Sequence, residues 1–244
     1  ARAAPDGYTL IMGTSSTFGA NPAMYKNLSY DAIRDFSPIV FVSFVPNVLV
    51  VHPGIAVKTV QELVALAKSR PGQINFASSG IGGTTHLAGE LFKVVAGVDI
   101  VHIPYKGTGQ ALTDLLNGQV QMSFSTVISM FPHIKSGKLN PLAVTSPKRV
   151  AALPEVQTMA EAKLPGVNAL SWNGLLVPSN TTRAIVSRLN SIANKILNTA
   201  EIREQLTKQG AEPVGGTPEE FSAFVKAEIT KWDKVIKAAG IRAE

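Results

Sequence analysis

The fold of this chain is decided by one stretch, which reads INFASSGIGGTTHLAGELFKVV over residues 74–95. The apolar run at 74–77 predicts a buried strand, and the glycine and hydroxyl residues at 78–85 predict a turn. Apolar residues then recur at helical spacing, so we expect a helix over 86–95 that ends at Gly97. The stretch is typical of a strand, a hydroxyl-rich turn and a helix.

The same pattern continues along the chain. We expect strands at 100–103, 120–124 and 139–144, with a turn at 104–109 and a helix at 110–117. Strands that alternate with helices at this spacing predict a mostly parallel sheet with right-handed crossovers. The expected fold class is therefore α/β.

Further elements are expected on either side of this region. Thr59 and Glu62 form a capping box that predicts the start of a helix, and Thr217 carries the same signal for a final helix. An apolar face at helical spacing predicts one long helix around 185–196, and alternation at 8–12 predicts a short strand.

Two long extended segments, 44–52 and 172–179, each contain proline and have no helix between them and their neighbouring strands. We interpret them as two strands that pass between lobes. This interpretation predicts a discontinuous first α/β lobe, formed by residues 1–52 and 171–244, and a second α/β lobe formed by residues 53–170.

Composition narrows the class of protein. The 244 residues are 45% hydrophobic and 16% charged, which is typical of a folded chain and excludes a disordered one. The net charge is +6, but the basic residues are scattered, so nucleic acid is not expected as a partner. The absence of cysteine excludes disulfides and thiolate metal sites, and no apolar run approaches the ~20 residues of a membrane-spanning helix.

Three turns that follow expected strands are rich in small hydroxyl residues. In an open α/β sheet, ligands bind beyond the carboxyl ends of the strands, where helix N-termini present unpaired amides. Amides, hydroxyls and the helix dipole favour an anion, so we expect the turns to converge on one anion site; the alternative is that the hydroxyls only cap helices. The residues expected to bind the ligand are Thr14, Ser15, Ser16, Thr17, Ser78, Ser79, Gly80, Gly82, Thr84, Thr85 and Ser125.

Two further candidates, Tyr105 and Lys106, lie in the turn at 104–109. Lys106 either meets a ligand carboxylate directly or is a solvated loop cation. No cofactor is expected, because Thr85 occupies the last glycine position of a dinucleotide fingerprint that would begin at Gly80, and no phosphate-binding loop or nucleophile elbow is present.

The histidines do not predict a metal site. They are His52, His86, His102 and His133. None has the spacing of a metal motif, and the alternating position of His102 in an expected strand is typical of a hydrogen-bonded core histidine. An enzyme that uses the hydroxyl-rich turns, with His86 or His102 as its base, is the alternative function, although no nucleophile, base and orienting acid lie at recognisable spacing.

Several short motifs together resemble one family. They are Pro5-Asp6-Gly7-Tyr8-Thr9-Leu10, Asn21-Pro22, Asp35-Phe36-Ser37-Pro38-Ile39, Ala77-Ser78-Ser79-Gly80 with His86-Leu87, Pro104-Tyr105-Lys106-Gly107 and Leu153-Pro154-Glu155-Val156. In this order they resemble the Bug receptors, which are the extracytoplasmic solute receptors of tripartite tricarboxylate transporters. The resemblance covers essentially the whole chain.

The resemblance implies a two-lobe fold of the periplasmic-binding-protein type II class, with two crossing hinge strands. It implies a monomeric periplasmic receptor, without catalysis, that closes over a small carboxylate and delivers it to membrane permease subunits. Ligand carboxylates in this family are held by backbone amides, hydroxyls and waters. Family members begin with a strand and a helix ahead of the Pro5 motif, and these are expected to be missing from this chain. Ligand specificity is expected around Phe18, Ile81 and Val127.

Overall fold

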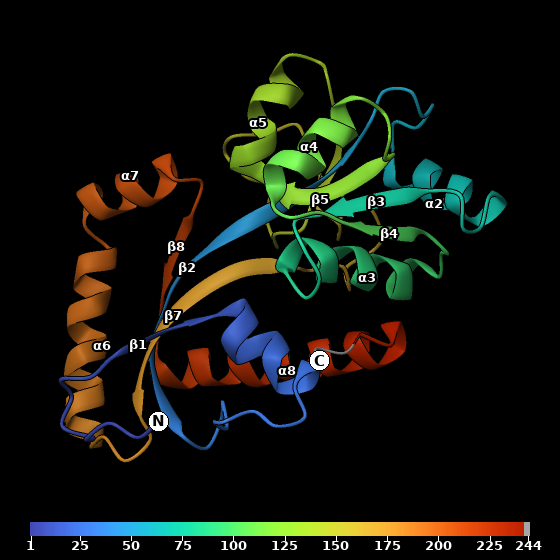
Figure 1. Ribbon diagram of the computed structural model, residues 1–244. Coiled ribbons are helices and arrows are strands. Elements are labelled where there is room, and N and C mark those ends of the chain that lie inside the picture. Colours follow the sequence, from blue (N-terminus) through green and yellow to red (C-terminus); the bar gives the residue numbers. More distant parts are fainter. Residues whose placement is uncertain (242–244) are drawn as a thin grey trace. The chain divides into compact units, whose positions relative to one another are not determined.

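The computed structural model describes residues 1–241 and divides into two compact units (Figure 1). Unit 1 consists of Ala1–Val45 and the chain from Ser171 onward, and unit 2 is Pro46–Leu170. The first crossing between them lies inside strand β2 (Phe36–Val51), whereas the boundary expected from the sequence follows His52, just after this strand ends. The second crossing lies at the start of β7 (Leu170–Pro178).

Unit 2 contains a five-stranded sheet in the order β6-β2-β5-β3-β4. Its further elements are α2 (Val60–Ser69), β3 (Asn75–Ser78), α3 (Thr84–Ala96), β4 (Val101–Pro104), α4 (Thr108–Leu116), β5 (Met122–Thr126), α5 (Val127–Lys135) and β6 (Asn140–Val144). β3 is parallel to β4 and β5, but β2 is antiparallel to β5 and β6. The mostly parallel sheet expected from the sequence is therefore wrong, because β2 enters unit 2 as a crossing strand without a crossover helix.

Helices cover both faces of this sheet, with α4 and α5 on one face and α3 on the other (Figure 1). Successive side chains of β3 point to opposite faces of the sheet. Ala77 therefore lies in the hydrophobic cluster between the sheet and the helices α4 and α5, whereas Phe76 packs against α3. α3 approaches closely because residue 89 is glycine: a Cβ on Gly89 would lie 2.2 Å from the Phe76 ring. The close contact between α3 and β3 therefore keeps α3 packed on the sheet, with its first residues at the sheet edge.

Unit 1 is built around β1 and β7, which pair antiparallel, and β2 and β8, which also pair antiparallel. Its elements besides β2 and β7 are β1 (Ile11–Thr14), η1 (Ser15–Ala20), α1 (Asn21–Met24), α6 (Arg183–Leu197), α7 (Ala200–Lys208), β8 (Glu212–Gly215) and α8 (Pro218–Ala239). The strand predicted at 8–12 is wrong in its bounds, because Asp6 accepts a hydrogen bond from the Tyr8 amide and turns the chain there. The strand instead runs from Ile11 to Thr14, where Thr14 caps η1.

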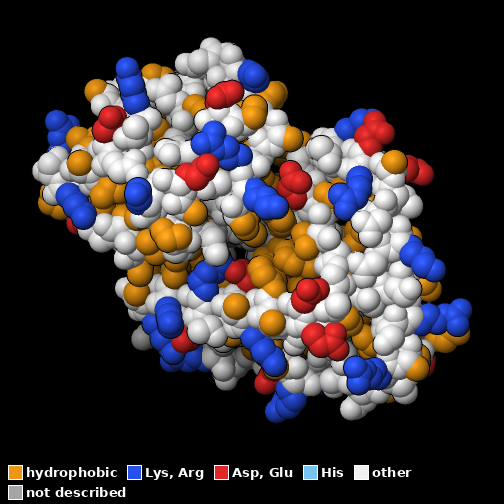
Figure 2. Space-filling view, turned by 180° about the vertical axis from the view of Figure 1, so that it is seen from behind, with side chains coloured by type: hydrophobic (Ala, Val, Ile, Leu, Met, Phe, Trp, Pro, Cys, Tyr) orange, Lys and Arg blue, Asp and Glu red, His pale blue; other side chains and the backbone are white. Residues whose placement is uncertain are grey.

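The surface carries its charges in a mixed arrangement. On the face shown in Figure 2, lysine and arginine side chains are interspersed with aspartate and glutamate, with no single basic patch. Of the helices that the structure describes, none combines the length and the apolar character needed to cross a membrane.

Candidate functional site

Three helices of unit 2 begin at the same edge of the sheet. α3, α4 and α5 follow β3, β4 and β5, which are parallel neighbours, so their N-termini lie beyond the carboxyl ends of adjacent strands. None of the three has a side-chain cap: their N-cap residues are Gly83, Gly107 and Thr126. The helices α2, α6, α7 and α8 are instead each capped by a threonine hydroxyl, from Thr59, Thr182, Thr199 and Thr217. The uncapped edge therefore combines helix-start amides with three positive dipole ends.

The turn between β3 and α3 is tied together by its own hydroxyl groups. The Thr85 hydroxyl accepts a hydrogen bond from the Ser79 amide at 3.0 Å and lies 3.0 Å from the Ser79 hydroxyl. Gly80 and Gly82 have φ values of 144° and 77°, in a region that disfavours residues with a Cβ. Thr84 begins α3. The structure thus brings Ser79 and Thr85 together in this turn.

The turn after β4 is attached to the same structure. The amides of Tyr105 and Gly107 donate to the carbonyls of Ser78 and Ser79, at 3.1 and 3.2 Å. The Tyr105 hydroxyl donates to Asp114, and burial raises the pKa of Tyr105 to about 12, so the phenol stays protonated. Lys106 is exposed and forms no ion pair within residues 1–241. It is a cation at this edge that is open to solvent.

Ser125 does not present its hydroxyl at the edge. It is buried and lies 3.1 Å from the Ser123 hydroxyl, which donates to the Ala77 carbonyl. The next hydroxyls along the chain, Thr126 and Ser129, lie 2.8 Å apart at the start of α5. Ser129 was not among the predicted residues, and Thr126-Val127-Ile128-Ser129 lacks the Glu or Gln of a capping box that would have marked this helix start.

The predicted residues of unit 1 form the start of η1. Thr14 and Thr17 form a capping box, in which each hydroxyl accepts from the other residue's amide, at 3.0 and 3.2 Å. These two hydroxyls therefore cap a helix, which is the alternative weighed from the sequence. The hydroxyls of Ser15 and Ser16 make no hydrogen bond within the described part of the chain.

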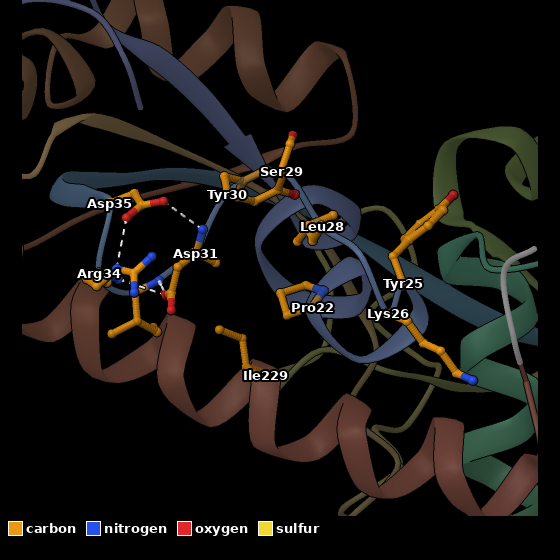
Figure 3. A pocket seen from close by; sticks show the side chains of 12 residues that line it. Pro22, Tyr25, Lys26, Leu28, Ser29, Tyr30, Asp31, Arg34, Asp35 and Ile229 are labelled. Carbon is orange, nitrogen blue, oxygen red and sulfur yellow. Dashed lines mark hydrogen bonds and ion pairs between the residues drawn. The ribbon is translucent and has the colours of Figure 1, made fainter.

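A separate cavity of about 520 Å³ lies in unit 1 between the loop before β2 and α8, and none of the predicted residues lines it (Figure 3). Two carboxylates line it, Asp31 and Asp35, and hydrogen bonds from backbone amides keep the pKa of each below its usual range. Arg34 is paired with Asp35 at 3.1 Å. Lys26 also lines the cavity, so two aspartates face one lysine and one arginine that is already paired, and the lining has no excess of positive charge to attract an anionic ligand.

The geometry does not favour the enzyme alternative. The Ser78 hydroxyl lies 2.6 Å from His102 Nε2, but Ser78 is 1% exposed. Burial lowers the pKa of His102 to about 4 and that of His86 to about 3, so both imidazoles are weak bases. No group of residues within 1–241 has the composition and geometry to hold a metal ion.

Comparisons with known proteins identify relatives over the whole chain. The family model described as "Tripartite tricarboxylate transporter family receptor" matches residues 1–241. Protein BugT of Bordetella pertussis is 35% identical over 243 residues, which cover 99% of this chain and 74% of BugT. Among solved structures, R. palustris Rpa4515 with adipate is 37% identical with a TM-score of 0.79, covering 99% of this chain and 81% of that one. MatC (Rpa3494) from Rhodopseudomonas palustris with bound malate is 31% identical with a TM-score of 0.74, covering 96% and 81%.

Proposed function

The chain belongs to the tripartite tricarboxylate transporter receptor family, and from this premise we propose that it is a periplasmic solute-binding protein that captures a small carboxylate. It delivers this ligand to the membrane subunits of a tripartite transporter and performs no catalysis. In this role the protein acts as a monomer. Two relatives of known structure hold adipate and malate, so we propose a small dicarboxylate as the ligand class.

The observation that carries the proposal is the uncapped sheet edge of unit 2. Three adjacent helices begin there without side-chain caps, whereas four other helices are capped by threonine. Unpaired amides at helix starts attract anions, and each charge-assisted contact is worth roughly 0.3–1 kcal/mol when exposed and more when desolvated. A ligand carboxylate offers acceptors to a helix start whose N-cap side chain makes no capping bond.

We assign the contacts at this edge as follows. Ser79, Thr85 and the amides at the start of α3 hold a carboxylate. The exposed ammonium group of Lys106 attracts the carboxylate electrostatically without touching it. Tyr105 stabilises the turn through the hydrogen bond from its hydroxyl to Asp114. In unit 1, Ser15 and Ser16 are the hydroxyls left for a ligand, because Thr14 and Thr17 cap η1.

Calorimetric titration with adipate and malate tests the proposal. The matched control is adipamide, which has the length of adipate but no charge, and we expect it not to bind. Ser79→Ala is expected to weaken binding about three- to tenfold, the effect of one hydrogen bond. Ser136→Ala, an exposed serine after α5, is the control and is expected to bind like wild type. Equal binding of adipate and adipamide, or no binding of any mono-, di- or tricarboxylate, would contradict a carboxylate receptor.

Delivery to a transporter is tested separately in cells. Removal of the gene for this protein is expected to abolish uptake of the labelled ligand, and expression of the wild-type protein is expected to restore it. Normal uptake in the deletion strain would contradict the proposed role.

A further inference from the structure

Two histidines, the buried His86 and the partly buried His102, lie behind the turn that joins β3 to α3. The rings of His86 and His102 are stacked, with centroids 3.8 Å apart and an angle of 17° between their planes. The Phe76 ring also lies against this pair, with its centroid 4.9 Å from that of His102 and 6.4 Å from that of His86. His86 comes from α3 and His102 from β4, so the stack joins a helix and a strand that both lead to the proposed site.

Each imidazole has one nitrogen hydrogen-bonded to the turn. The Gly82 amide donates to His86 Nδ1 at 3.0 Å. The Ser78 hydroxyl lies 2.6 Å from His102 Nε2, and it also accepts from the Gly80 amide at 3.2 Å. The Ser78 hydroxyl has one proton to donate, either to His102 Nε2 or to the Gly80 carbonyl, which lies 3.2 Å away. Because the contact with His102 is shorter, we assign Ser78 as the donor and His102 Nε2 as the acceptor.

These contacts require both histidines to be neutral. Burial, His102 and Lys93 lower the pKa of His86 to about 3, and burial and Lys93 lower that of His102 to about 4. The buried Glu90 lies 3.7 Å from His86 Nε2, but its charge is paired with Lys93 at 3.0 Å. With Nδ1 of His86 accepting from Gly82, its proton is on Nε2, on the side of Glu90.

We propose that His86 and His102 are positioning residues of the carboxylate site: as a stacked pair of acceptors for Gly82 and Ser78, they hold the turn that carries the Ser79 and Thr85 hydroxyls in the position from which the ligand is bound. This inference rests on the proposed function. The turn contains two glycines at positive φ, and the contacts of Ser78 and Gly82 with the stacked rings are the restraint that we assign to it.

Asparagine and glutamine separate this role from simple packing. The side-chain oxygen of asparagine takes the place of Nδ1, and that of glutamine takes the place of Nε2. His86→Asn therefore keeps the acceptor for Gly82, and His86→Gln loses it. At His102 the order is reversed, because Nε2 is the acceptor there, so His102→Gln keeps the bond and His102→Asn loses it.

We expect a crossed pattern when adipate and malate are titrated. His86→Asn and His102→Gln should bind close to wild type, and His86→Gln and His102→Asn about tenfold more weakly, the effect of one lost hydrogen bond. If the histidines only packed, the same substituent, asparagine or glutamine, would bind the ligand more tightly at both positions. That result would overturn the inference.

Two measurements without ligand separate this inference from the proposed function. Hydrogen exchange of the Gly82 amide should be slow in wild type and His86→Asn and fast in His86→Gln. In wild type at pH 7, nitrogen NMR should show unprotonated Nδ1 in His86 and unprotonated Nε2 in His102, which needs no variant to fold. The opposite tautomers would overturn the inference, and so would equal exchange rates of the Gly82 amide in His86→Asn and His86→Gln. If no carboxylate binds wild type, the proposed function fails while these measurements still decide whether the histidines hold the turn.

Discussion

Trp172 and Glu228 are joined by a buried hydrogen bond, in which the indole Nε1 donates to the carboxylate Oε2 at 3.0 Å. The Trp232 indole donates to the same oxygen at 3.0 Å, and Lys231 bonds the other oxygen. The indole of Trp232 lies against Gly19, where a Cβ would be 3.2 Å from its ring. One carboxylate therefore fixes the tryptophans that support η1, and with it the position of Ser15 and Ser16.

Glu228→Ala is expected to lower the free energy of unfolding by about 3–5 kcal/mol, because two buried indole donors and a lysine lose their acceptor. Glu228→Gln keeps one acceptor oxygen for the indoles and should cost only about 1–2 kcal/mol. Urea unfolding measures both. The control is Glu204→Ala, which removes an exposed ion pair with Lys208 and should change stability by less than about 1 kcal/mol. A loss in Glu228→Ala no larger than in this control would contradict the role of the carboxylate.

The contact between α3 and β3 gives a second prediction. Gly89→Ala is expected to destabilise unit 2 by about 1–3 kcal/mol, because its Cβ would lie 2.2–2.6 Å from three ring atoms of Phe76. Gly109→Ala is the matched control: it lies in α4 with nothing near its Cβ position, and alanine there should stabilise by up to about 1 kcal/mol. Thermal unfolding should show opposite shifts for the two variants. A Gly89→Ala variant that is as stable as wild type, or more stable, would show that the approach of α3 is not limited by Phe76.

The exposed position of Lys106 leads to a prediction about salt. Lys106→Gln is expected to weaken adipate binding about two- to fivefold at low ionic strength, the range of an exposed charge pair. The difference should disappear near about 0.5 M salt, where the screening length is about 4 Å. Lys68→Gln, an exposed lysine of α2, is the control and should bind like wild type at every salt concentration. A loss that persists at high salt would indicate direct contact of Lys106 with the ligand carboxylate.

Much of the fold could be predicted because its signals are local. The helices beginning after Thr59 and Thr217 are confirmed, since a threonine cap needs only neighbouring residues to form. The family resemblance is also confirmed, because its motifs are spread along the chain in order. The helix expected around 185–196 is confirmed as α6, and α7, which begins after a further threonine cap at Thr199, was not predicted.

Features that depend on distant partners could not be predicted. α5 contains Pro132, which argues against a helix from sequence, yet the helix forms directly after β5. The antiparallel pairing of β2 with β5 depends on the path of the chain between units, which no local pattern records. Likewise, Ser125 has the residue type of a site hydroxyl, but only the sheet shows that it bonds to Ser123.

The lowered pKa values of His86 and His102 predict how stability depends on pH. In the unfolded chain both imidazoles take up protons as the pH falls through about 6.5, whereas in the folded protein they stay neutral until about pH 4 and 3. Between these limits the unfolded state binds more protons, so the free energy of unfolding should fall as the pH is lowered from 7 to 4. The double variant His86→Asn/His102→Gln keeps both acceptors but has no imidazole to titrate at either position. Its stability should therefore fall less steeply over this range in urea unfolding at successive pH values, while Glu90 and Lys93 contribute to both proteins alike. Parallel curves for wild type and double variant would show that the histidines are not held neutral behind the turn.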